Sequence, residues 1–230
     1  MIQAFRNFIT RRTFAYKLRN KAMNMFSSFE NFNLIREKAE ASRKAENRPH
    51  EVLYFHKVDD PYSHLTVHYI DKFKEAYDVQ FKPILVGEEN PAALHEPTLY
   101  TDYCLEDVKR IASYYNVDFP GKSYPDKKLV DKANSILTAV NPDEFGSVAK
   151  TVSHALWSGD LAKFEELEVS YKSSEQEVIE TLKEGNEIRN GCDYYFGSAF
   201  YYEKELYWGV DRLNHCLLYT SDAADDTCCG

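Results

Sequence analysis

The chain has 230 residues, a formal net charge of −9, and a composition that is 43% hydrophobic and 14% aromatic. This length predicts one domain with an insertion, and the apolar content is enough for a sizeable core rich in aromatic rings. A mean hydropathy of −0.54 and the lack of a long apolar run exclude a predicted transmembrane segment. The acidic balance argues against nucleic acid as a partner.

The first 50 residues differ in charge from the rest of the chain. They hold eleven Lys or Arg and four Glu, a net charge of +7, whereas residues 51–215 carry −13. Apolar residues recur here at helical spacing, as at Ile2, Phe5 and Ile9. We therefore expect residues 1–50 to form a basic helical arm. Three roles stay open for it: docking on the acidic body, a transit peptide, or attachment to a membrane surface.

A strand–helix–strand unit is predicted next. The apolar run 51–56 indicates a strand, and 61–77 has an apolar stripe at helical spacing. Residues 79–86 then indicate a second strand, whose imperfect alternation is typical of a strand covered on both faces. This order defines a βαβ unit with its two strands parallel.

A long helical section and a hairpin complete the predicted order. Helical periodicity is found in five segments: 99–115, 127–140, 142–157, 161–171 and 175–190. Strand character returns at 200–208, with a turn at Glu203 and Lys204, and a last helix follows. We predict an α/β protein with a thioredoxin-like fold and an inserted all-helical domain. The thioredoxin-like part would comprise 51–90 and 191–215, and the insertion 91–190.

Residues 216–230 break the character of what precedes them and hold three of the five cysteines. The segment CLLYTSDAAD resembles the translation of a transposon-type sequencing-library adaptor, so we expect a non-native tail here. Without the tail, only Cys104 and Cys192 remain, too few for a disulfide framework. A reducing compartment, and hence a cytoplasmic location, is the expectation.

The junction HKVDDPYSHL, residues 56–65, is the first candidate site. Asp60 precedes Pro61 at the predicted start of a helix, which suits an N-cap residue followed by a proline that needs no N–H donor. A capping carboxylate at a strand–helix junction can also act as a general base if its pKa is raised. Capping does not forbid this second role.

Three segments carry a family resemblance. YFHKVDDPYSHL, LEDVKRIASYYNVDFP and ELYWGVDRL resemble, in this order, parts of the DsbA-like thioredoxin superfamily. The branch they resemble contains the 2-hydroxychromene-2-carboxylate isomerases and kappa-class glutathione transferases, and the likeness covers residues 51–215. It implies a glutathione-dependent isomerase or transferase that acts on a small, aromatic electrophile. A homodimer is left open as a further partner.

The resemblance also implies site residues. Asp60 and Ser63 would occupy the catalytic positions, and Asp211 would meet the glutamyl amino group of glutathione. The stretch Gly197, Ser198 and Ala199 replaces the usual cis-proline loop, and we expect its peptide bonds to be trans because a non-proline cis bond costs about 2.5–4 kcal/mol. Since no cysteine lies in the motif, dithiol–disulfide exchange is excluded.

Two alternatives compete with the enzyme hypothesis. An ionised carboxylate about 4 Å from a thiolate repels it by roughly 4 kcal/mol at an effective dielectric near 20. Asp60 therefore also fits a binding or scaffolding module that has kept the fold and lost the chemistry. The other alternative is a metal site at His64 and His68, which are four residues apart on one helix edge near His56 and Asp59. HxxxH alone is a weak signal, and we predict no metal.

Overall fold

The computed structural model describes residues 14–87, 94 and 96–220 of the chain. Contacts between residues divide the chain into two compact units, Met1–Arg48 and Pro49–Gly230. None of the described helices is both long enough and apolar enough to cross a lipid bilayer.

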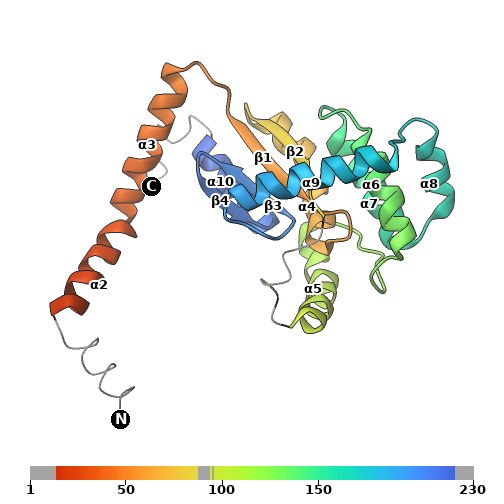
Figure 1. The fold of residues 1–230 in the computed structure, drawn as a ribbon, viewed down its shortest axis with the longest axis horizontal. Helices are drawn as coiled ribbons and strands as arrows, with labels where there is room; N and C mark the ends of the chain where they lie inside the picture. The colour runs from red at the N-terminus through yellow and green to blue at the C-terminus, as the bar shows by residue number, and fades with distance from the viewer. Residues whose placement is uncertain (1–13, 88–93, 95, 221–230) are drawn as a thin grey trace, which may run out of the picture. The chain divides into compact units, whose positions relative to one another are not determined.

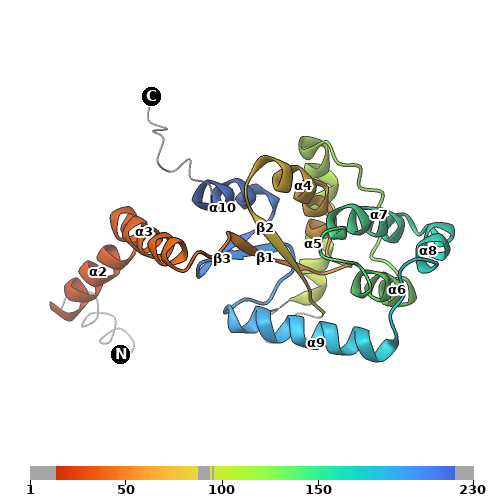
Figure 2. The same ribbon diagram turned by 90° about the horizontal axis from the view of Figure 1, so that it is seen from above.

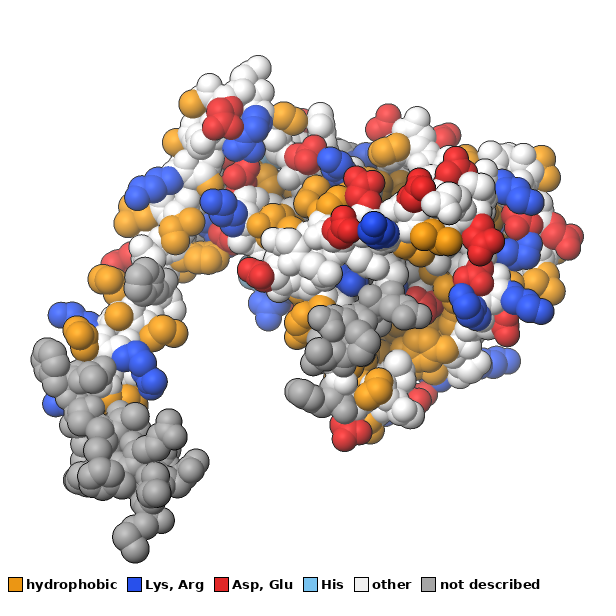
Figure 3. All heavy atoms as spheres, viewed as in Figure 1, with side chains coloured by type: hydrophobic (Ala, Val, Ile, Leu, Met, Phe, Trp, Pro, Cys, Tyr) orange, Lys and Arg blue, Asp and Glu red, His pale blue; other side chains and the backbone are white. Residues whose placement is uncertain are grey.

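The described part of the first unit, from Phe14 on, contains two helices, α2 (Phe14–Phe26) and α3 (Phe29–Ala45). Ser28 separates them and caps α3, because its side chain accepts a hydrogen bond from the backbone N–H of Asn31 at 3.2 Å. Large apolar side chains are exposed along both helices (Figure 3): Leu18, Met23, Met25, Phe29, Phe32, Leu34 and Ile35. The apolar positions predicted at residues 2–9 lie outside the described residues.

The second unit is built on a four-stranded sheet with the order β2-β1-β3-β4 (Figure 1). β1 (Glu51–His56) pairs in parallel with β2 (Gln80–Leu85) and antiparallel with β3 (Ala199–Tyr202), which pairs antiparallel with β4 (Glu205–Trp208). β2 is an edge strand, which is why it can contain Pro83 without breaking a central ladder.

The predicted hairpin turn is confirmed at Glu203 and Lys204. Both residues have positive φ angles, 44° and 71°. A two-residue hairpin connection with positive φ at both positions matches the right-handed twist of the strands that it joins. The turn therefore forms despite having neither asparagine nor glycine.

The sheet is covered on both faces (Figure 2). On one face, α4 (Pro61–Ala76) and α10 (Leu213–Thr220) lie over Val52, Tyr54 and Phe200. On the other face, α9 (Glu175–Gly191) packs Ile188 against Phe55 and Ile84. Alternate residues of β1 thus enter two separate cores, as the period of a strand requires.

The helical section contains five α-helices in its described part. They are α5 (Pro97–Ile111), α6 (Lys127–Thr138), α7 (Phe145–Ser158), α8 (Leu161–Glu168) and α9. The predicted helix 99–115 ends in a 3-10 turn, Ala112–Tyr115. The predicted helix 142–157 starts three residues late, because Pro142 belongs to a turn in which its carbonyl accepts from the N–H of Phe145.

The C-terminal end of the described chain belongs to the fold. A 3-10 turn, Val210–Arg212, leads into α10, where Leu213 and Cys216 are fully buried in the same core as the sheet. Cys216 is the first residue of the predicted non-native tail. Residues 221–230 of that tail lie outside the described residues.

Candidate functional site

Asp60 caps α4, as its sequence position predicts. Its Oδ1 accepts from the N–H of Tyr62 at 3.3 Å, and its Oδ2 accepts from the N–H of Ser63 at 3.0 Å. The hydroxyl of Ser63, which is fully buried, also donates to Oδ2 at 2.8 Å. Pro61 occupies the first helical position, where no N–H is needed. The two predicted catalytic residues are therefore in direct contact.

Burial raises the pKa of Asp60 to about 6, against hydrogen bonds and the Lys57 charge, which lower it. The ammonium group of Lys57 forms an ion pair with Asp59 at 2.8 Å, so its charge is shared between two carboxylates. A carboxyl group with a pKa near neutrality can both accept and return a proton at physiological pH. This is the property that general acid–base catalysis requires.

The loop before β3 lies directly against the start of α4. A Cβ atom added at Gly197 would lie 2.8 Å from the Cβ of Lys57, 3.1 Å from Asp60 Oδ2 and 3.3 Å from Ser63 Oγ. Only glycine allows the backbone to come this close. The structure thus brings Gly197 together with both predicted catalytic residues.

Ser198 and Ala199 hold this loop in place. Ser198 has a φ of +51°, is fully buried, and shares a hydrogen bond of 2.7 Å with the hydroxyl of Thr66 on α4. Its carbonyl accepts from the N–H of Gly209 at 2.8 Å. Ala199 begins β3 opposite Phe55. No cis peptide bond occurs among the described residues, so the bonds of this loop are trans, as expected.

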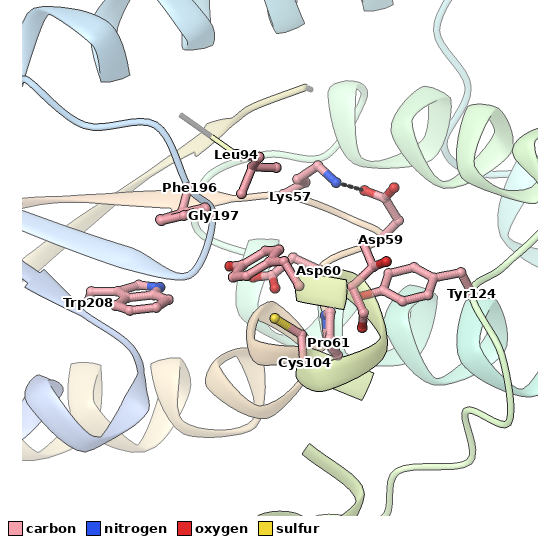
Figure 4. A pocket seen from close by; sticks show the side chains of 12 residues that line it. Lys57, Asp59, Asp60, Pro61, Leu94, Cys104, Tyr124, Phe196, Gly197 and Trp208 are labelled. Atoms are coloured by element: carbon pink, nitrogen blue, oxygen red, sulfur yellow. Dashed lines mark hydrogen bonds and ion pairs between the residues drawn. The ribbon is translucent and has the colours of Figure 1, made fainter. Parts of the chain in front are cut away.

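A small pocket of about 110 Å³ opens in front of Asp60 (Figure 4). Lys57, Asp59, Asp60, Pro61 and Gly197 form one part of its lining. Three stacked aromatic rings form another part. The ring of Phe196 lies between those of Tyr100 and Trp208, with centroid distances of 5.2 Å and 5.3 Å. The stacked rings offer a flat apolar surface beside a titratable carboxyl group.

Cys104 also lines this pocket, a position that the motif alone does not predict. It lies on α5 beside Pro61, and only 2% of its surface is exposed (Figure 4). Burial raises the pKa of this thiol to about 11, and the Asp60 charge adds to the effect. Cys104 is therefore a protonated thiol at neutral pH. The spacing of Tyr100 and Cys104, four residues apart on a predicted helix, is the signal that would place both on one face.

Asp211 is not among the residues that line the pocket. It lies in the 3-10 turn after β4 with its side chain 61% exposed, 3.5 Å from the guanidinium of Arg212. Burial raises the pKa of Tyr115, the last residue of the 3-10 turn that follows α5, and the charge of Asp211 raises this pKa further. Asp211 therefore lies near that turn. The structure therefore separates Asp211 from the lining that contains the other predicted site residues.

The two histidines that suggested a metal site are engaged in other interactions. The Nε2–H of His64 donates to the carbonyl of Asp118 at 2.8 Å, so its Nδ1 accepts from Ser153 Oγ at 2.9 Å. The Nδ1–H of His68 donates to the carbonyl of His64. In the described part of the chain, no three His, Cys, Asp or Glu side chains are arranged to hold a metal ion.

The fold can be compared with that of a solved structure. The solved structure of a 2-hydroxychromene-2-carboxylate isomerase matches this chain with a TM-score of 0.50 and 16% sequence identity, over 72% of this chain and 91% of that chain. No protein-family model matches the sequence, and no curated protein matches it. The fold is therefore confirmed as α/β, a thioredoxin-like fold with inserted helices. At this identity, the likeness extends to the fold alone.

Proposed function

We propose that this protein is a glutathione-dependent isomerase or transferase that acts on a small aromatic electrophile in the pocket at the start of α4. The observation that carries the proposal is the position of Asp60, a carboxyl group with a pKa raised to about 6 that faces the pocket against Gly197. The stacked wall of Tyr100, Phe196 and Trp208 supports a flat aromatic substrate.

Two features support glutathione bound by its reacting end. The backbone at Gly197 passes so close to Asp60 and Ser63 that a Cβ would fill the space between them. A pocket of about 110 Å³ is well below the roughly 300–1,000 Å³ of pockets for whole ligands, so it would enclose only that end. When bound, glutathione would supply a sulfur nucleophile.

Asp60 would manage the proton in this reaction. As a carboxylate it can accept a proton at Oδ2, the oxygen that faces Gly197, and as a neutral acid it can return it. Protonation also removes a like-charge repulsion of roughly 4 kcal/mol from the site. Because the pKa of Asp60 is about 6 and that of a free thiol is near 8.5, transfer of the thiol proton to Asp60 is unfavourable by about 3 kcal/mol. This is a small part of a catalytic barrier.

One observation favours a second function, a binding module without chemistry. The N–H groups of Tyr62 and Ser63 at the start of α4 already donate to Asp60. A helix N-terminus stabilises an external anion through such N–H groups, and here the protein's own carboxylate occupies them. A site filled in this way can retain a ligand and still fail to activate a thiol.

Glutathione titration by calorimetry on the full chain tests the proposal, beside Asp60→Ser, Asp211→Ala and the exposed control Asp102→Ala. We expect binding in the micromolar-to-millimolar range for the wild type and the control, and turnover of 1-chloro-2,4-dinitrobenzene that Asp60→Ser changes in its pH profile. Binding without turnover would favour the binding module. Loss of binding in Asp211→Ala would extend the glutathione site to Asp211. No heat from folded wild type would rule out the glutathione proposal.

A further inference from the structure

The helix α2 carries basic side chains and no acidic one. Lys17, Arg19 and Lys21 lie on it, and no acidic residue precedes Glu30 in the sequence. The neighbouring helix α3 differs, since its four basic residues stand beside three glutamates. The excess of positive charge in the described part of the first unit therefore belongs mainly to α2.

Apolar side chains form a stripe along α2. Successive residues of an α-helix are about 100° apart around its axis, so Leu18, Ala22 and Met25 share one side of the helix. Leu18 is 57% exposed and Met25 is 61% exposed, although both side chains are large and apolar. Met23 is also 61% exposed, but it lies outside the stripe by more than a quarter of a turn. Apolar surface that is exposed in a contiguous stripe marks a site of interaction with a protein or a membrane.

The basic residues of α2 flank this stripe. Around the helix, Lys17 and Lys21 lie on one side of the stripe and Arg19 on the other. The two asparagines of the helix, Asn20 and Asn24, lie opposite the stripe. Figure 3 shows basic side chains beside apolar ones along this unit. Long basic side chains in such positions keep their charges in a polar layer while their methylene groups follow apolar surface.

This pattern fits the surface of an anionic lipid bilayer. A basic amphipathic helix lies in the membrane interface with its apolar side at the acyl chains. Anionic headgroups attract each Lys or Arg that comes near the surface. A protein partner would need an apolar groove with carboxylates along both of its sides, whereas a bilayer with anionic lipids offers apolar depth and negative charge at every position.

We propose that α2 binds the surface of a membrane that contains anionic lipids, with the stripe of Leu18, Ala22 and Met25 at the acyl chains and the three flanking cations at the lipid phosphates. Such binding is peripheral and reversible, because a single short helix with a few cations is a weak anchor. It does not rest on the proposed function, since no residue of the pocket at Asp60 takes part.

Co-sedimentation of the full chain with vesicles tests the role of charge. We expect binding to mixed phosphatidylcholine and phosphatidylserine vesicles to be at least about tenfold stronger than binding to phosphatidylcholine alone. Raising the salt concentration from about 0.1 M to about 1 M shortens the screening length from about 10 Å to about 3 Å and should largely abolish this preference. Lys17→Gln combined with Lys21→Gln should weaken binding about tenfold or more. Lys128→Gln combined with Lys172→Gln removes the same charge from exposed positions of the second unit and should leave binding unchanged.

A matched pair of methionine variants tests the stripe. Met25→Gln should weaken binding to the anionic vesicles roughly threefold to tenfold, because it removes apolar surface from the side that meets the acyl chains. Met23→Gln changes an equally exposed methionine outside the stripe and should leave binding unchanged. Glutamine and methionine have similar helix propensities, so α2 should stay helical in both variants, which circular dichroism checks.

Limited digestion with trypsin separates a membrane from a protein partner. Cleavage after Lys17, Arg19 and Lys21 that slows only when anionic vesicles are added would support the proposal. Slow cleavage without vesicles would show that α2 packs on a protein surface, and would overturn it. The proposal also fails if the wild type does not sediment with anionic vesicles, if it binds neutral vesicles equally well, or if the two methionine variants have equal effects.

Discussion

The Oδ2 atom of Asp60 accepts two hydrogen bonds from Ser63, one from its backbone N–H at 3.0 Å and one from its hydroxyl at 2.8 Å. The same oxygen lies 3.1 Å from the place of a Cβ at Gly197. One atom therefore serves the helix as a cap and, in the proposed function, accepts a proton in the pocket. These two roles can be separated by substitution.

Asp60→Asn should stabilise the protein at neutral pH. Asparagine caps a helix about as well as aspartate, so the variant loses the ionisation and one acceptor, that of the 3.3 Å hydrogen bond from the N–H of Tyr62. Burial raises the pKa of Asp60 from 3.8 to about 6, so the folded state is stabilised when Asp60 is protonated. This contribution to the free energy of unfolding is fully present below pH 3.8 and is lost as pH rises through 6. We expect the variant to gain about 1–2 kcal/mol over wild type at pH 7 and little at pH 4, by denaturant unfolding.

Two further variants separate the effect of the charge of Asp60 from the effect of its helix cap. Asp60→Ala removes the cap as well as the charge and should unfold about 1 kcal/mol more easily than Asp60→Asn at every pH. Asp126 caps α6 at the exposed surface, so Asp126→Asn should change stability little at either pH. A gain for Asp60→Asn that does not vary with pH would contradict the assignment.

Cys104 should react slowly with alkylating agents. Its thiol is 2% exposed and burial raises its pKa to about 11, so the nucleophilic thiolate is scarce at pH 8. We expect iodoacetamide to modify Cys104 at least tenfold more slowly than a free cysteine, by mass spectrometry of digested protein. A probe that enters the pocket should slow the reaction further. Rapid modification of the folded protein would contradict the description of this wall.

Two buried histidines should make the protein sensitive to acid. Burial lowers the pKa of His56 to about 3 and that of His64 to about 4, so both stay neutral in the folded state while their unfolded forms titrate near 6.5. The contribution of the two histidines to the free energy of unfolding is therefore fully present above pH 6.5. Below pH 6.5 it should decrease by up to about 1.4 kcal/mol per pH unit for each histidine. Unfolding midpoints of Asp60→Asn between pH 7 and 5 measure this slope, because Asp60 itself titrates near pH 6 with the opposite sign.

A matched pair of variants assigns this acid sensitivity. In the Asp60→Asn background, His64→Gln should remove about half of the slope, because glutamine takes up no proton when the chain unfolds. His154 lies on α7 with its ring about half exposed, so His154→Gln should leave the slope unchanged. Equal slopes in Asp60→Asn with and without His64→Gln would show that other groups take up the protons.

Gly185→Ala should destabilise the contact between α9 and β2. A Cβ at this position would lie 1.8 Å from the carbonyl oxygen of Leu85, so the helix or the strand would have to move. We expect a loss of about 1–3 kcal/mol in denaturant unfolding. Gly191 ends the same helix, and a Cβ added there would meet nothing within 4 Å, so Gly191→Ala is the control and should be neutral or slightly stabilising.

Ser198→Pro should destabilise the loop before β3. Proline fixes φ near −65°, whereas Ser198 has a φ of +51°. We expect a loss of about 3 kcal/mol or more, measured by thermal unfolding. Ser198→Gly relieves the left-handed conformation and loses the hydrogen bond to Thr66, two effects of about 1 kcal/mol each that nearly cancel. A stable proline variant would mean that the loop has a second conformation.

Local sequence patterns predicted most of the fold. The strand at Glu51–His56 and the hairpin turn at Glu203 and Lys204 are confirmed, because periodicity and turn geometry act over a few residues. The cap at Asp60 is confirmed for the same reason, since it needs only the neighbouring N–H groups of Tyr62 and Ser63. Helix ends such as that near Pro142 were displaced, where turns compete with helices on similar terms.

The site could be predicted only in part, because its walls come from distant segments. Gly197 meets Asp60 across more than a hundred residues, and the family resemblance supplied that pairing rather than any local pattern. Cys104 sits on a predicted helix, yet nothing in the spacing says which cavity that helix will face. The exposure of Asp211 depends likewise on where the last turn is placed.

Gly185 has a consequence for how this protein can be divided. The helix that carries it lies within the inserted segment of the chain, but the close approach to Leu85 and the packing of Ile188 on Phe55 make that helix the cover of one sheet face. Excising residues 91–190 would uncover that face, and a shortened scaffold that joins 51–90 to 191–215 should aggregate. Engineers who seek a minimal version should keep α9 and graft new helices before it.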